Sequence, residues 1–271
     1  MASSFVQQVF AHPGSKWIFL GWSGFIAENL LLSENREQLV ARVGEDQYRA
    51  AYGTLSTLAC SSIVYGFVVH GFRTGPTVAP VPVRGAAFAV QALGLAMLAS
   101  SALPKLQVPV SVARSPASSS APSSPAPVPQ PTLKLLCPVD FAHARNAEPN
   151  EMGLKRITRH PQLFALGLTA LGTALSTSFL TTRILCGFPI VFAVIGGAHQ
   201  DVRFLRSGSY SHDYVDSTSL MPFVALMTGN QKWSDLASEI KWVNVSLGVL
   251  VAGMLARRRM VLAKSPFISS N

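Results

Sequence analysis

The sequence predicts an all-α fold, a polytopic membrane helix bundle with about six transmembrane helices. The first observation is composition: the 271 residues are 49% hydrophobic and only 13% charged, whereas a soluble domain carries about 25% charged residues. The second is the distribution of the apolar residues, which gather in six long segments separated by polar ones. Together they indicate a chain that crosses a bilayer several times.

The six apolar segments run over 17–32, 51–72, 85–103, 161–180, 184–198 and 242–256. A spanning helix needs about 20 residues, so the second, third and fourth are long enough and the others must extend into their flanks. Lipid offers no hydrogen-bond partner to the backbone, so each segment must be helical. Small residues such as Gly94, Gly167 and Gly172 let helices approach closely. Pro189 is expected to kink the fifth helix.

The linker between the third and fourth segments divides the chain into three parts. Residues 1–103 form an N-terminal membrane half of three helices, 104–152 a linker loop, and 153–271 a C-terminal half of three helices. The linker contains "VARSPASSSAPSSPAPVPQP" at 112–131, which is too rich in proline and serine, and too poor in apolar anchors, to fold alone. We therefore expect a partner subunit to hold it.

The charge of the chain indicates which partners it has. The net charge is +9, and in a membrane protein such an excess faces anionic lipid or acidic partners. No basic run is interleaved with aromatic residues, so we expect no nucleic-acid binding. The start, "MASSFVQQVFAHPGSK", lacks the charged region of a secretory signal and the arginines of a presequence. We expect no cleaved targeting segment.

Several polar side chains within or beside the apolar segments are candidates for chemistry. Glu28 and Asn29 lie deep in the first segment; either the helix ends at Ala27, or both residues have a polar partner inside the membrane. His70 and His199 lie at helix ends. The sequence has no His pair at i, i+4 and no Cys-x-x-His, so spacing alone predicts no metal site.

Four ordered stretches resemble the NnrU family. "GLKRITRHPQLF" (153–164), with its RHPQ motif, is the most informative of them, and "GEDQYRAAYGTLS" (44–56) resembles the family's opening of the second helix. "GGAHQDVR" (196–203) and "STSLMPFVALMTGNQK" (217–232) are similar to two later family segments. Their order and spacing agree along almost the whole chain except the linker.

The resemblance also extends to the zeta-carotene isomerases, a haem-containing branch of that family. It implies a b-type haem held by a histidine of the first helix and by a Cys-x-x-His of the fourth. These positions fall on Asn29, Ala170 and Thr173 here. An amide and a hydroxyl are poor ligands for haem iron. We therefore interpret the three as degenerate cofactor positions and expect no catalytic residue, metal or haem.

The basic residues before the fourth segment have two interpretations. Arg156 and Arg159 can anchor the helix at the lipid headgroups, with Pro161 at its first position. Alternatively Arg156, Arg159 and His160 form a lipid- or anion-binding site, for which the headgroup of a structural phospholipid such as cardiolipin is suited.

Three functions follow from these interpretations. The first is a non-catalytic NnrU-like accessory subunit of a multi-subunit bioenergetic membrane complex, in contact with other subunits and lipids. Its expected location is the mitochondrial inner membrane (respiratory chain), with a chloroplast membrane second. The alternative is a haem-dependent, zeta-carotene isomerase-like enzyme with displaced ligands, such as His70 or His199. A sensor or assembly factor for nitrogen-oxide metabolism rests only on the family name.

Overall fold

The computed structural model describes residues 2–78, 84–103, 105–106, 110–114, 131–135, 139–140 and 152–264. The N-terminal helices are α1 (Ala2–Ala11), α2 (Pro13–Glu34), α3 (Arg36–Val43), α4 (Glu45–Gly66), its π-helical continuation η1 (Phe67–Gly71), and α5 (Arg84–Ala102). The C-terminal elements are the 3₁₀ turn η2 (Gly153–Arg156), α6 (Pro161–Ser176), α7 (Leu180–Arg206), α8 (His212–Ser217), α9 (Val224–Met227), α10 (Trp233–Glu239) and α11 (Trp242–Lys264).

The predicted linker, 104–152, lies largely outside the described residues. Within it, four short strands pair in two antiparallel two-stranded sheets. Strand β1 (Lys105–Leu106) pairs with β4 (Val139–Asp140), and β2 (Val110–Arg114) pairs with β3 (Pro131–Leu135). Outside this range, the named elements of the described chain are helices, and the division into 1–103, 104–152 and 153–271 stays a prediction.

Each of the six apolar segments is helical over most of its length, although the fourth, 161–180, is broken after Ser176. The prediction of six membrane-spanning helices is not confirmed. By length and composition, three described helices can span a membrane, Glu45–Gly71, Gly85–Ala102 and Leu180–Arg206. A fourth span is added if α10 and α11, which meet at 86°, count as one broken span. The α6 helix has 16 residues, about 24 Å at 1.5 Å per residue, against a hydrocarbon layer of about 30 Å.

The α2 helix is not among the candidate membrane spans for a different reason. It has 22 residues, but Glu28 and Asn29 lie inside it and lower its apolar character. The interpretation that this helix ends at Ala27 is wrong, because α2 continues to Glu34. The Asn29 amide donates to the carbonyl of Phe25 at 2.8 Å, and a carboxylate oxygen of Glu28 accepts a hydrogen bond from Ser56 of α4. Both polar groups therefore have partners within the helix pair.

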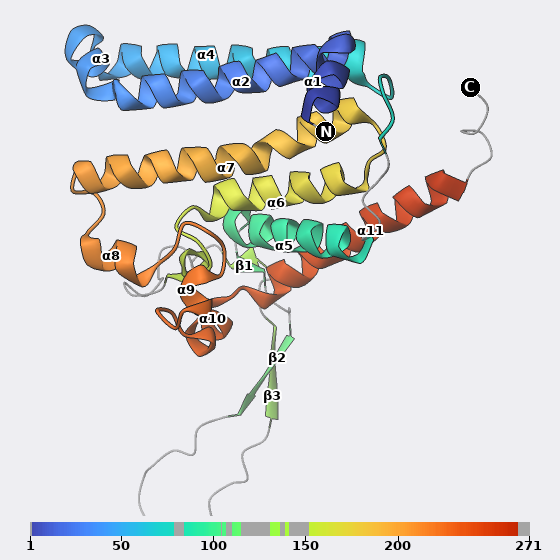
Figure 1. The fold of residues 1–271 in the computed structure, drawn as a ribbon. Helices are drawn as coiled ribbons and strands as arrows, with labels where there is room; N and C mark the ends of the chain where they lie inside the picture. The colour runs from blue at the N-terminus through green and yellow to red at the C-terminus, as the bar shows by residue number, and fades with distance from the viewer. Residues whose placement is uncertain are drawn as a thin grey trace, which may run out of the picture.

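The helices follow a continuous packing order with α7 at its centre (Figure 1). The α2 helix packs against α4 and α7, α6 packs against α7 and α5, and α5 also packs against α11. Pro189 lies inside the 27-residue α7, which continues past it. Gly167 of α6 lies opposite this point, where an added Cβ would come within 3.2 Å of the Pro189 carbonyl oxygen.

Two apolar clusters lie at different places in the bundle. One consists of Met97, Ile157, Phe164, Ala165, Ala193, Leu226 and Leu236, and joins α5, α6 and α7 to the segment 220–236. The other consists of Val9, Ile18, Ile63, Leu180 and Ile184, and joins α1, α2 and α4 to the start of α7. The long α7 helix contributes to both and therefore connects the two membrane halves.

The tightest helix contacts occur where glycine leaves room for a neighbouring backbone. A Cβ on Gly94 of α5 would lie 2.6 Å from the hydroxyl of Thr169 in α6. A Cβ on Gly248 of α11 would lie 2.6 Å from the Cα of Ala96 in α5. The predicted role of small residues in close helix approach is confirmed at these sites.

We expect Gly94→Ala to lower the thermal unfolding midpoint in detergent. The added methyl group must push α6 away, which costs about 1–3 kcal/mol for overpacking, more than the gain of up to about 1 kcal/mol from better helix propensity. Gly187→Ala in α7 is the matched control, because nothing lies within 4 Å of its added Cβ. Equal midpoints for the two variants would contradict the role assigned to Gly94.

Candidate functional site

The RHPQ motif lies where the chain enters α6. Pro161 occupies the first helical position, where its missing N–H is not needed and its fixed φ suits the helix. The residue before a proline is disfavoured in the helical region, and His160 has φ −118° and ψ 62°. The motif therefore ends the preceding turn and holds Arg159 and His160 at the mouth of the helix.

Asp201 of α7 joins these two side chains in one buried cluster. Its Oδ1 lies 2.7 Å from Nε2 of His160, and its Oδ2 accepts hydrogen bonds from Nη2 (2.7 Å) and Nε (3.0 Å) of Arg159. All three side chains are about nine-tenths buried. Because a buried charge is costly unless it is paired, the carboxylate and the guanidinium each require the other as a partner.

The remaining donors of Arg159 fix the end of α8 and the residues that follow it. Its Nη1 donates to the backbone carbonyls of Val215 (2.9 Å) and Thr218 (3.0 Å). Its backbone N–H donates to the carbonyl of Ser219 at 2.9 Å. One arginine therefore connects the start of α6, the buried face of α7 and the 215–219 segment.

Arg156 forms a second, separate network. Its Nη2 and Nε donate to the two carboxylate oxygens of Glu239 at 2.5 and 2.8 Å, and its Nη1 donates to Oε1 of Gln231 at 2.5 Å. The hydrogen bonds to Glu239 raise the pKa of Arg156 above its ordinary value. The same carboxylate accepts the backbone N–H of Gly153 at 2.7 Å. This network fixes η2 against α10.

The structure brings the three predicted lipid- or anion-binding residues to one end of the bundle, but into two separate clusters. Arg156 is bonded to Glu239, whereas Arg159 and His160 share Asp201. Lipid or anion binding by Arg156, Arg159 and His160 stays a prediction. The sequence interpretation missed Asp201 and Glu239. The signal for Asp201 was present in "GGAHQDVR", an acidic residue directly after an apolar, glycine-containing run.

The positions implied for haem ligands belong to helices on opposite sides of α7. Asn29 lies in α2, and Ala170 and Thr173 lie in α6; each helix packs on α7 (Figure 1). Asn29 accepts a hydrogen bond from the Tyr52 hydroxyl, and the Thr173 hydroxyl accepts one from the Gln91 amide at 2.9 Å. The side chains present therefore do not fit a haem, because they supply no imidazole or thiolate and have hydrogen bonds within the bundle.

The two histidines considered as displaced ligands lie far apart. The His70 ring packs against the ring of Trp17, with their centroids 5.8 Å apart, near the start of α2. The His199 Nε2 lies 3.9 Å from a carboxylate oxygen of Glu34, at the end of α2. The length of α2 between Gly14 and Glu34 is about 30 Å at 1.5 Å per residue. One porphyrin cannot bind both. Across the described residues, no three His, Cys, Asp or Glu side chains are grouped to hold a metal ion.

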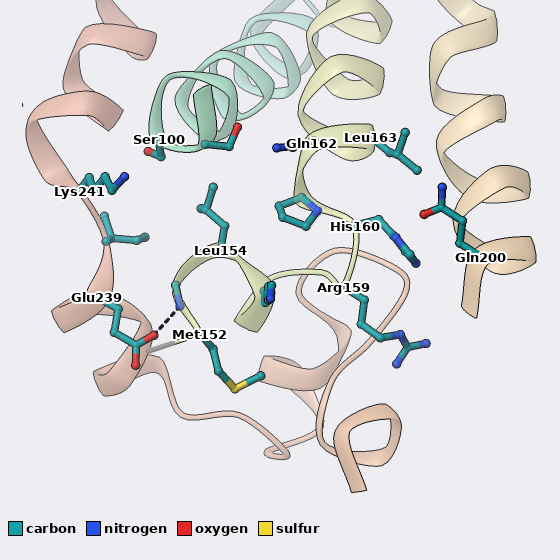
Figure 2. A pocket seen from close by; sticks show the side chains of 15 residues that line it. Ser100, Met152, Leu154, Arg159, His160, Gln162, Leu163, Gln200, Glu239 and Lys241 are labelled. Carbon is teal, nitrogen blue, oxygen red and sulfur yellow. Dashed lines mark hydrogen bonds between the residues drawn. The ribbon is translucent and has the colours of Figure 1, made fainter. Parts of the chain in front are cut away.

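A cavity of about 510 Å³ opens beside the RHPQ motif. Figure 2 shows Ser100 and Lys241 on one side of it and His160 and Gln162 on the other. The lining residues come from the ends of α5, α6 and α10, from η2, and from Gln200 in α7. Most of the residues that line this cavity are polar or charged, and Asp201 is not among them.

We expect Asp201→Asn to destabilise the protein strongly. The substitution leaves the buried guanidinium of Arg159 without a counter-charge, which costs about 3–5 kcal/mol. Asp213→Asn is the matched control, because Asp213 is exposed in the first turn of α8, where a change within about 0.5 kcal/mol is usual. Unfolding midpoints in detergent compare the two, and equal midpoints would show that the cluster contributes little.

Comparison with known proteins gives one match. The family model described as NnrU protein matches residues 18–263, which include the RHPQ motif, Asp201 and Glu239. No curated protein and no solved structure matches the chain. The match spans nearly the whole length, including the helices and the clusters described above, and the chain therefore belongs to the NnrU family.

Proposed function

We propose that this NnrU-family chain is a non-catalytic integral membrane protein that acts as an accessory subunit of a multi-subunit bioenergetic complex. One observation carries the proposal: the residues at the positions where the resemblance places haem ligands are poor ligands for haem iron. Asn29 and Thr173 supply no imidazole, and both are hydrogen-bonded to neighbouring helices, to Tyr52 and Gln91. The positions that the resemblance assigns to haem ligands therefore take part in contacts between the helices.

The outer face of α4 supports a role in assembly. This helix is long and apolar enough to span a membrane, yet only 11% of its most apolar window is buried inside the protein. Exposed small residues recur along it at helical spacing: Ala50, Gly53, Thr54, Thr57 and Ser61. Such spacing lets a second helix approach closely in lipid. The occupant that we propose is a transmembrane helix of another subunit.

The location that we propose is the mitochondrial inner membrane, as part of the respiratory chain, with a chloroplast membrane as the second location. The net charge of +9 suits a membrane whose surface is anionic. The linker, for which we expect a partner subunit, is consistent with a chain that functions inside a larger assembly.

We expect the protein, purified from its native membrane in mild detergent, to give no stoichiometric Soret band. It should also migrate far above its 28.9 kDa on a native gel, together with redox subunits. The alternative enzyme, with a haem on displaced ligands, predicts the opposite spectrum. A Soret band that is lost in His70→Ala or His199→Ala would overturn the non-catalytic assignment.

We expect Gly53→Leu to release the chain from the large complex without changing its own stability. The larger side chain keeps a partner helix at a distance, whereas inside the chain nothing lies within 4 Å of the added Cβ. Gly253→Leu in α11 is the matched control, since its Cβ also meets nothing. Native gels of membranes that express each variant provide the measurement. Co-migration of Gly53→Leu at the full size would contradict docking on α4.

A further inference from the structure

A second cavity lies beside the polar one and shares a wall with it. It has a volume of about 250 Å³ and is lined by apolar side chains of α5, α10 and α11 and of the segments between them. Leu154 and Ile240 line both cavities. At the apolar cavity, Trp233 and Trp242 are 55% and 58% exposed, as expected for tryptophans at the level of the lipid headgroups.

The polar cavity carries positive charge that the described chain does not neutralise. Lys155 and Lys241 both line it, and neither forms an ion pair with a described carboxylate. Glu239 also lines the cavity, but both of its oxygens accept hydrogen bonds from Arg156, and one also from the N–H of Gly153. The local charge available to a ligand is therefore positive.

The first turn of α6 adds hydrogen-bond donors to the same cavity. The N-cap residue, His160, makes no side-chain cap, because its imidazole is bonded to Asp201. Gln162 and Leu163 line the cavity, and their N–H groups receive no cap from His160. The N-terminal end of a helix attracts anions through such donors and the helix dipole.

The wall opposite α6 contains a buried hydroxyl without a partner. Ser100 is 6% exposed, lines the cavity, and its Oγ has no hydrogen-bond partner among the described residues. Two carbonyls in the last turns of α5 already accept side-chain hydrogen bonds, because Ala99 accepts from the Asn244 amide and Leu98 accepts from the Ser101 hydroxyl. The Ser100 hydroxyl is thus a buried donor at this wall that no described residue uses.

We propose that the two cavities form one site for an anionic glycerophospholipid. The phosphate lies between Lys155, Lys241 and the first turn of α6, and one acyl chain lies over Leu154 and Ile240 in the apolar cavity. The position at the end of the bundle, among helix ends and exposed tryptophans, corresponds to the depth of the headgroups. This site is distinct from the guanidinium groups of Arg156 and Arg159, which carboxylates occupy, and it does not depend on the accessory role.

The test uses the full chain, stripped of lipid in detergent, and dioleoyl phosphatidylglycerol as the probe, measured by native mass spectrometry. Phosphatidylglycerol should bind more tightly than phosphatidylcholine with the same acyl chains. Because each lysine near an anionic lipid contributes about a factor of five or more in affinity, Lys155→Ala/Lys241→Ala should lower binding about tenfold or more. The matched control, Lys232→Ala, removes an exposed lysine outside the cavity and should leave binding unchanged.

A second variant distinguishes a lipid from a free phosphate. Ala237 is exposed and lines the apolar cavity, so Ala237→Trp should fill it, weaken phosphatidylglycerol binding and leave the unfolding midpoint unchanged. Inorganic phosphate should not compete at concentrations equal to the lipid. Equal binding by the double variant and Lys232→Ala would overturn the proposal. So would equal binding of the two lipids, or phosphate competing as well as phosphatidylglycerol.

Discussion

The carboxylate of Asp201 is the interaction on which the arrangement of the C-terminal half depends. It lies on α7, and its two oxygens bond to consecutive residues at the mouth of α6, Arg159 and His160. Through the other donors of Arg159, the same cluster holds the end of α8 and the residue that follows it. Such a group is tolerated only when all of its members are present, because removal of one partner leaves an unpaired buried charge. This dependence explains how a short polar motif fixes the positions of α6, α7 and α8 relative to one another.

The same cluster determines what the cavity in front of it can do. His160 is bonded to Asp201, so it does not cap α6, and Gln162 and Leu163 of the first turn line the cavity. Arg156 is likewise bonded to Glu239, which removes one negative charge from the cavity wall. Buried ion pairs behind the cavity thus leave Lys155 and Lys241 as the charges that a ligand meets. The ion pairs that hold the helix ends together therefore also produce the preference for an anionic ligand that we propose.

The α7 helix separates the pair α2 and α4 from the helices α5 and α6. It lies between α2 and α6 (Figure 1), so Asn29 and Thr173 each find partners in an outer helix, α4 and α5, and not across a shared cavity. Asn29, Thr173 and one carboxylate oxygen of Glu28 consequently have hydrogen-bond partners within helix pairs. The outer face of α4, with little of its apolar window buried, is left to lipid or to another helix.

The sequence by itself determined the helical class, the six apolar segments, the start of α6 at Pro161 and the family, because apolar periodicity, composition and short motifs are local properties. It did not determine how many helices span the membrane, since that depends on where each one ends: α6 stops at Ser176 and α2 continues past Glu28 to Glu34. Nor could it pair Arg159 with Asp201 or Arg156 with Glu239, which lie 42 and 83 residues apart in the chain. Only the packing of α6 on α7 and of η2 on α10 decides which charges meet, because a buried charge takes its partner from the helix that lies beside it and not from its neighbours in sequence.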